Sequence, residues 1–423
     1  MQDNQQSWNL HSHAISWSLS IASAVLVMFF VTVPLNQSAR AQTFQVLYSF
    51  SGTPDGASPS NLTIDAAGNL YGVASGGGIN YNGTVFKLSR ENSGWVLARL
   101  YSFQGGEDGS TPAAPLIAGP HGSFYSITRY GGGGSGTVYS LSPPATAICQ
   151  GAPCPWIETV LYRFQGAPDG QFPVGAIVSD RAGNLYGATQ LGGIYGNEGL
   201  VYELTPSLSG WTEAVVHYFR GGSNDGAQPF TGLIFDQAGS LYGTTIQGGA
   251  TNEGAVVQLT PNGGLWSWTV LHSFDPAVDG WYPFGGLISD RAGNLYGTTT
   301  WAGPNSGGTV YELIRGTDNH WTFAVLYALP RSGGYGPTAS VTMDAAGNLF
   351  GTTLEGGAFG YGNVFKLTPS GQSWIYTSLH DFTGGNDGAG ANSAVVLDTN
   401  GNLYSTAGGG GQYGYGVVFE ITP

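Results

Sequence analysis

Charge is scarce in this 423-residue sequence, in which only 9 % of the residues are Asp, Glu, Lys or Arg. Lysine occurs just twice, as Lys87 and Lys366, and no basic run or stripe is present. This argues against nucleic acid and anionic membranes as partners, because both are recognised by clustered positive charge. The net charge of −14 suits a soluble protein that meets neutral or cationic ligands.

Cysteine is also rare, with Cys149 and Cys154 close together in "ICQGAPCPW". Two cysteines are too few for a zinc site, and we expect a local disulfide that fixes one loop of an exported protein. No stretch of 10–12 residues has a helical apolar period, and no serine–histidine–acid elbow, phosphate loop or zinc motif occurs. The 71 glycines have no three-residue period, which excludes collagen, and 41 % hydrophobic residues suffice for a core.

The N-terminus has the pattern of an export signal. The apolar run "IASAVLVMFFVTVPL" (21–35) precedes "SARA", in which Ala39 and Ala41 form an A-x-A cleavage site. We therefore predict a signal peptide over residues 1–41 and a secreted or periplasmic mature chain from Gln42, free of the membrane. An uncleaved anchor is the alternative, because no Lys or Arg precedes the apolar run.

One octapeptide recurs along the mature chain: "DAAGNLYG" at residue 65 returns, with changes, at residues 119, 180, 236, 290, 344 and 398. Each unit carries four short segments rich in β-branched and aromatic residues, such as 231–236, 240–246, 254–260 and 266–274 in the fourth. Seven units of four strands predict an all-β fold, a seven-bladed β-propeller with four-stranded antiparallel blades and a single domain over 42–423.

The octapeptide itself predicts a hairpin turn, with its Asp as a cap and its Gly in the left-handed position. The first β segment, 44–50, matches the fourth segment of other units, whereas the last, 416–423, matches the third. We therefore expect the N-terminal strand to close the last blade. Seven self-contained blades that start at Phe44 are the alternative. Since the last strand ends at Pro423, we expect no C-terminal anchoring segment.

The strings "GNLYGTT" (293–299) and "GTVYEL" (308–313), with a Gly-rich stretch between them, recur in order across 44–423. In this the chain resembles the bacterial GloVer-type tandem repeat, and more weakly the kelch repeat. The resemblance implies exported, propeller-type proteins without an assigned activity.

Two sets of loops are the candidate sites, and both are expected on the face opposite the octapeptide turns. The loops between blades carry Asp-Gly pairs, and the loops inside blades are Gly-rich with an aromatic residue. Glycine, aromatic rings and carboxylates together suit sugar rings, so we name both sets as candidate ligand-binding residues. These are Asp55, Asp108, Asp169, Asp225, Asp279 and Asp387, with Tyr81, Tyr130, Tyr195, Trp301, Tyr361 and Tyr415. Turn chemistry for the aspartates and loop-to-loop packing for the aromatics are the alternatives.

Catalysis has little support in the sequence. His217, His272 and His380 stand where other units have Tyr, so we interpret them as filling a structural position. Glu198 and Glu253, in matching "NEG" strings, are the only candidate catalytic acids. We expect a monomeric, non-catalytic binding propeller for an extracellular ligand such as a glycan or protein. It would need no cofactor, although its Asp-Gly loops could bind Ca²⁺. A polysaccharide hydrolase or lyase, or a protein-interaction scaffold, are the alternatives.

Overall fold

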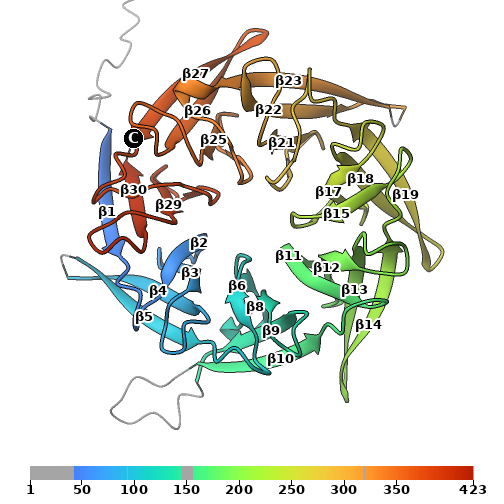
Figure 1. The fold of residues 1–423 in the computed structure, drawn as a ribbon, viewed down its shortest axis with the longest axis horizontal. Coiled ribbons are helices and arrows are strands. Elements are labelled where there is room, and N and C mark those ends of the chain that lie inside the picture. The colour runs from blue at the N-terminus through green and yellow to red at the C-terminus, as the bar shows by residue number, and fades with distance from the viewer. Residues whose placement is uncertain (1–41, 93, 145–155, 319, 423) are drawn as a thin grey trace, which may run out of the picture. The chain divides into compact units, whose positions relative to one another are not determined.

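The computed structural model describes residues 42–92, 94–144, 156–318 and 320–422, and its strands form seven antiparallel sheets arranged as blades around a central axis (Figure 1). The predicted seven-bladed propeller is confirmed. The predicted signal peptide and both cysteines lie outside the described residues. Within them, no helix is long and apolar enough to cross a membrane.

Each blade begins at the central axis. The innermost strands are β2 (Ala57–Ile64), β6 (Ser110–Pro112) with β7 (Ile117–Ala118), β11 (Gly170–Ser179), β15 (Gly226–Pro229) with β16 (Ile234–Phe235), β20 (Ile288–Ser289), β24 (Thr342–Met343) and β28 (Val396–Leu397). The second strands are β3 (Leu70–Gly76), β8 (Phe124–Tyr130), β12 (Leu185–Gly192), β17 (Leu241–Gly248), β21 (Leu295–Thr299), β25 (Leu349–Thr352) and β29 (Leu403–Ala407).

The outer half of each blade is longer and more regular. The third strands are β4 (Thr84–Glu91), β9 (Thr137–Ser142), β13 (Leu200–Ser207), β18 (Ala255–Asn262), β22 (Ser306–Arg315), β26 (Asn363–Ser370) and β30 (Val417–Thr422). The outermost are β5 (Gly94–Ser102), β10 (Ile157–Arg163), β14 (Gly210–Tyr218), β19 (Leu265–Ser273), β23 (Trp321–Pro330), β27 (Ser373–Asp381) and β1 (Thr43–Ser49). Two short 3₁₀ turns, η1 (Pro120–Gly122) and η2 (Arg331–Gly333), complete the elements.

The N-terminal strand closes the ring, as predicted, and the alternative of self-contained blades is wrong. Strand β1 pairs with β30 in the order β1-β30-β29-β28, so the first strand of the chain is the outermost strand of the last blade. Leu47 and Phe50 are buried against Tyr404 and Val418 of that blade and against the first blade. This closure covers the edge of β30 and gives the last blade four strands, like the others.

The octapeptide forms the turn between the two innermost strands. In the first blade, the Asp65 carboxylate accepts hydrogen bonds from the backbone N–H groups of Ala67 (2.9 Å) and Asn69 (2.8 Å) and from the Asn69 side chain (2.8 Å). Gly68 has a φ of +80°, the left-handed conformation that the turn requires. The predicted turn-capping role of this Asp is confirmed.

The hydrophobic core lies between neighbouring blades rather than inside one sheet. Tyr242, Val256 and Phe274 of the fourth blade pack with Leu295 and Tyr311 of the fifth, and similar clusters join the other pairs. The last glycine of the octapeptide, which lies in the second strand rather than in the turn, is needed for this packing. At Gly297, a Cβ atom would lie only 2.4 Å from the Tyr311 hydroxyl, because the ring covers the strand there.

Candidate functional site

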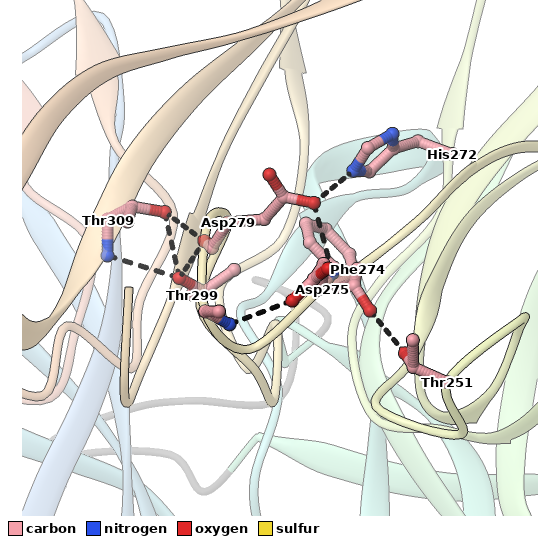
Figure 2. A network of polar contacts seen from close by, with 8 residues as sticks. Thr251, His272, Phe274, Asp275, Asp279, Thr299 and Thr309 are labelled. Carbon is pink, nitrogen blue, oxygen red and sulfur yellow. Dashed lines mark hydrogen bonds and ion pairs between the residues drawn. The ribbon is translucent and has the colours of Figure 1, made fainter. Parts of the chain in front are cut away.

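The Asp-Gly loops hold each carboxylate in a local hydrogen-bond network. Figure 2 shows the fifth blade, in which the buried Asp279 carboxylate contacts His272 Nε2 (2.8 Å) and accepts the Asp275 backbone N–H (3.0 Å). The Asp279 carbonyl accepts the hydroxyls of Thr299 (2.9 Å) and Thr309 (2.7 Å). The residue therefore joins the outermost strand of one blade to the middle of the next.

The same pair recurs at five other blade boundaries. The partner is always a Tyr or His seven or eight residues earlier, at the end of the outermost strand. The pairs are Tyr48–Asp55 (2.8 Å), Tyr101–Asp108 (2.9 Å), Tyr162–Asp169 (3.2 Å), His217–Asp225 (3.2 Å) and His380–Asp387 (3.1 Å). Both side chains offer a ring-borne donor, which explains why His and Tyr alternate in the sequence.

These six aspartates are not brought together in one cluster. Each contacts groups of its own boundary, and no group of three or more His, Cys, Asp or Glu side chains suited to a metal ion is found among the described residues. The ligand-binding role of the six aspartates and Ca²⁺ binding by their loops stay predictions. The observed hydrogen bonds indicate that the carboxylates stabilise the boundaries between blades.

A second contact from the next blade covers each histidine of these pairs. The rings of Trp268, Phe323 and Phe44 stack on His217, His272 and His380 with centroid distances of 4.1, 3.9 and 3.6 Å. In the second and third blades the stacking position holds Glu158 and Glu213 instead. Burial, and then the negative charges of Asp108 and Asp169 respectively, raise the pKa of each glutamate to about 7.

These two glutamates should make the stability depend on pH. Because their folded-state pKa values lie above the unfolded value, their contribution to the free energy of unfolding is highest below about pH 4.5 and falls as the pH rises to about 7. Both side chains are partly exposed, so we expect only about 1 kcal/mol per site. The variant E158Q/E213Q should therefore melt at a higher temperature than the wild type at pH 8, with a smaller difference at pH 5. Equal shifts at both pH values would contradict this assignment.

The aromatic residues of the intra-blade loops are mostly exposed. Tyr81, Tyr130, Tyr195, Tyr361 and Tyr415 are exposed, and Trp301 is half-buried. Five of the six also pack on a neighbouring loop: Tyr415 on Gly52, Tyr361 on Gly384, Tyr130 on Phe172, Tyr195 on Arg220 and Trp301 on Tyr335. Surface exposure leaves these rings accessible to a ligand, and their role in binding stays a prediction.

Glu198 and Glu253 occupy the same loop position as Tyr361 and Tyr415. Each directly precedes a glycine whose backbone N–H donates to the carbonyl of a glycine at the start of the same loop. No hydrogen bond or ion pair links Glu198 to Glu253 in the part of the chain that the structure describes. The assignment of these two residues as catalytic acids gains no support from a shared site.

The central channel contains a cavity of about 580 Å³ to which all seven blades contribute. Its lining is made of small and apolar residues, with no charged side chain among those described. The walls differ between sectors: Phe230 and Phe284 line it on one side, and Ser58, Ser60 and Asn392 on another. A smaller hollow of about 280 Å³ lies beside His121 and Trp211, near the octapeptide turns.

Aromatic side chains from five successive blades, together with one arginine, form a series that we call the aromatic arc, and two of them, Phe230 and Phe284, line the channel. It comprises Arg129, Tyr130, Phe172, Phe230, Trp281, Tyr282, Phe284, Trp301 and Tyr335, from the second to the sixth blade. Successive ring centroids lie 4.7 to 5.8 Å apart for Tyr130–Phe172, Phe230–Phe284, Phe284–Tyr282, Tyr282–Trp281 and Trp301–Tyr335. The Arg129 guanidinium bridges Tyr130, Phe172 and Phe230 at 5.4 to 5.9 Å.

Most of the arc was not predicted from the sequence, although Tyr130 and Trp301 were. Its members stand at positions whose residue type varies among the repeats. The position after "LYGTT", for example, holds Ser75, Arg129, Gln190, Ile246, Thr300, Leu354 and Gly408. Comparison of the repeats position by position would have found this signal, because positions that the blade itself requires keep one residue type.

The backbone that carries the arc has a left-handed residue at one position of each blade. Phe172, Gln228 and Tyr282 each precede a proline and have φ values of +57°, +52° and +53°. The last two blades place Gly336 and Gly390 at this position. Ser58 and Thr111 of the first two blades also have positive φ values here, +53° and +56°, so the left-handed conformation belongs to every blade and is not specific to the arc.

Propellers of known structure are similar to this chain in fold. A candidate 6-phosphogluconolactonase from Bacteroides uniformis is 15 % identical with a TM-score of 0.51, over 76 % of this chain and 84 % of that one. The extracellular domain of a candidate hybrid two-component system from B. thetaiotaomicron is 13 % identical with a TM-score of 0.55, over 90 % of this chain and 42 % of that one. Both likenesses concern the fold alone.

Among curated proteins, none matches the sequence. The family model described as the Gloeobacter/Verrucomicrobia repeat matches residues 35–150, 147–320 and 290–423, which together span the whole propeller. The resemblance to the GloVer-type repeat is thereby confirmed, and the chain belongs to the Gloeobacter/Verrucomicrobia repeat family.

Proposed function

We propose that this protein is an exported, non-catalytic binding propeller that holds a saccharide against the aromatic arc at the mouth of its channel. One observation carries the proposal. The arc is built at positions that vary among seven otherwise similar repeats, so the blade architecture does not require its rings. Two of its members, Phe230 and Phe284, line the central cavity, and contacts between neighbouring side chains connect Phe230 to Arg129 and Phe284 to Tyr282.

The chemistry of the arc suits sugars. Aromatic faces contact the apolar C–H faces of a pyranose, while planar polar groups beside them can bond its hydroxyls. Such groups lie next to the arc: Gln228 donates to Gln247 (3.0 Å), and Glu355 accepts the Tyr335 hydroxyl. Export is supported by the apolar run at 21–35 with its A-x-A site, and it would bring the site into contact with extracellular glycans.

Substitution of Phe230 and Phe284 should weaken saccharide binding without loss of the fold. The corresponding residue of the sixth blade is Thr338, so F230T and F284T introduce a side chain that this repeat already accepts. We expect each loss of a ring to reduce affinity about tenfold. The residue 42–423 chain would be screened on a glycan array, and the ligands found would be titrated by calorimetry.

The matched control is Tyr81→Ala, which removes an exposed ring of the same face that makes no contact with the arc. Its affinity should equal that of the wild type. If Y81A loses binding while F230T/F284T keeps it, the ligand sits on the outer loops rather than at the channel. Reducing-end release from a bound polysaccharide would instead indicate a hydrolase.

A further inference from the structure

We infer that the saccharide carries an anionic group, a carboxylate or a sulfate, and that Arg129 binds it. This inference rests on the proposed function, since it concerns the ligand of the same arc. Arg129 is the one charged residue at the variable position that follows the "LYGTT" segment, and it lies beside Phe230 of the channel wall, whereas a second guanidinium beside the arc, that of Arg331, stacks on Tyr335 at its far end at 5.9 Å.

The guanidinium of Arg129 is held in place by its neighbours but its charge is not neutralised. It lies 5.4 Å from the ring centroid of Phe230, 5.6 Å from that of Phe172 and 5.9 Å from that of Tyr130. Its Nη2 donates to the neutral amide of Gln190. Among the residues that the structure describes, no carboxylate forms an ion pair with it, in a chain of net charge −14.

This arrangement favours an anion over a neutral hydroxyl. A guanidinium has five N–H donors in one plane, and within the described ranges Arg129 donates a side-chain hydrogen bond to Gln190 alone, which leaves other donors for a ligand. A planar carboxylate can accept two of them at once, which a hydroxyl cannot. The surrounding rings exclude water from one side of the pair, which strengthens the attraction between opposite charges.

The orientation of the ligand follows from the same geometry. Phe230 both contacts the Arg129 guanidinium and lines the channel, so an anion on Arg129 places the adjoining sugar ring over Phe230 and Phe284. At the far end of the arc, the Tyr335 hydroxyl donates to Glu355, so the free lone pairs of both groups can accept hydrogen bonds from sugar hydroxyls. A uronate or a sulfated sugar within a longer chain meets these requirements.

The test compares an anionic oligosaccharide with its neutral methyl ester and adds a sulfated oligosaccharide as a second anion. Oligogalacturonate, its methyl ester and a sulfated galactan oligosaccharide would be titrated against the residue 42–423 chain. The variants would be R129Q, which takes the residue that the next blade has at this position, and R129K. The control is R220Q, because Arg220 also stacks on an exposed tyrosine of a loop, Tyr195, at 4.6 Å, outside the arc.

We expect at least one anionic ligand to bind the wild type and R220Q at least tenfold more tightly than the methyl ester. R129Q should abolish this difference and bind the ester within about twofold of the wild type, and R129K should retain part of it. A preference for the sulfated oligosaccharide or for the uronate identifies the anion. Equal binding of charged and neutral ligands, or a preference that survives in R129Q, overturns the inference about Arg129 and leaves the proposed function standing. If no saccharide binds, the proposed function fails with it.

Discussion

Deletion of residues 42–50 should abolish cooperative folding of the propeller. The deletion removes β1, and with it the backbone ladder to β30 from Thr43↔Thr422 to Ser49↔Val417. It also removes Phe50, which is fully buried. Loss of a buried Phe side chain alone costs about 3–5 kcal/mol, and the whole strand should cost as much as the net stability of a typical domain. Calorimetry should show no cooperative melting transition, and the exposed edge should cause aggregation.

A permuted variant is the control for this deletion. Transfer of residues 42–50 to the C-terminus, behind a short Gly-Ser linker after Pro423, makes the last blade continuous in sequence. Because the same strand is then restored to the same sheet, the permuted chain should melt cooperatively near the wild-type temperature. A deletion variant that melts like the wild type would show that the closure is dispensable.

Asp279→Ala should be among the most destabilising single substitutions at the rim. The carboxylate is buried, and its removal leaves His272 Nε2 and the Asp275 N–H without their acceptor (Figure 2). Each buried group left unsatisfied costs about 1–3 kcal/mol, so we expect the free energy of unfolding to fall by about 3 kcal/mol. Urea denaturation at pH 7 measures this free energy. Asp279→Asn keeps one acceptor oxygen, so its free energy of unfolding should fall by less.

The repeats provide a matched pair of controls for the same network. Tyr101 donates to Asp108, whereas Tyr327 has Gly334 seven residues later and no carboxylate partner. Tyr101→Phe should therefore cost about 1 kcal/mol, and Tyr327→Phe should have no measurable effect. Equal effects of the two substitutions would mean that the hydrogen bond to the loop Asp contributes nothing to stability.

The repeated features of the sequence predicted the architecture because the architecture itself is repeated. The octapeptide that begins at Asp65 recurs because every blade needs the same turn. Tyr and His alternate at the end of the outermost strand because either side chain can donate to a loop Asp. The phase of the repeat could also be predicted, from the match of 44–50 to an outermost strand. Local turn chemistry and strand pairing are encoded within one unit.

The aromatic arc could not be predicted in the same way. Arg129, Phe172, Phe230 and Phe284 come from four blades, and nothing in the sequence shows that their side chains meet. Their proximity results from the ring arrangement, which places equivalent ends of inner strands around one channel. Residues such as Asp55 and Tyr81 belong to patterns that recur from repeat to repeat and are therefore visible in the sequence. The arc lies at positions where the repeats differ.

Hydrogen exchange with and without a bound saccharide tests the central claim most directly, because it locates the ligand on the propeller. The account predicts protection of backbone amides in segments 127–131, 228–232 and 281–286, which carry the arc. Exchange at the turn over 65–69, on the opposite face, should not change. Protection of that turn, or of the loop around Tyr81, with none at the arc would contradict the account.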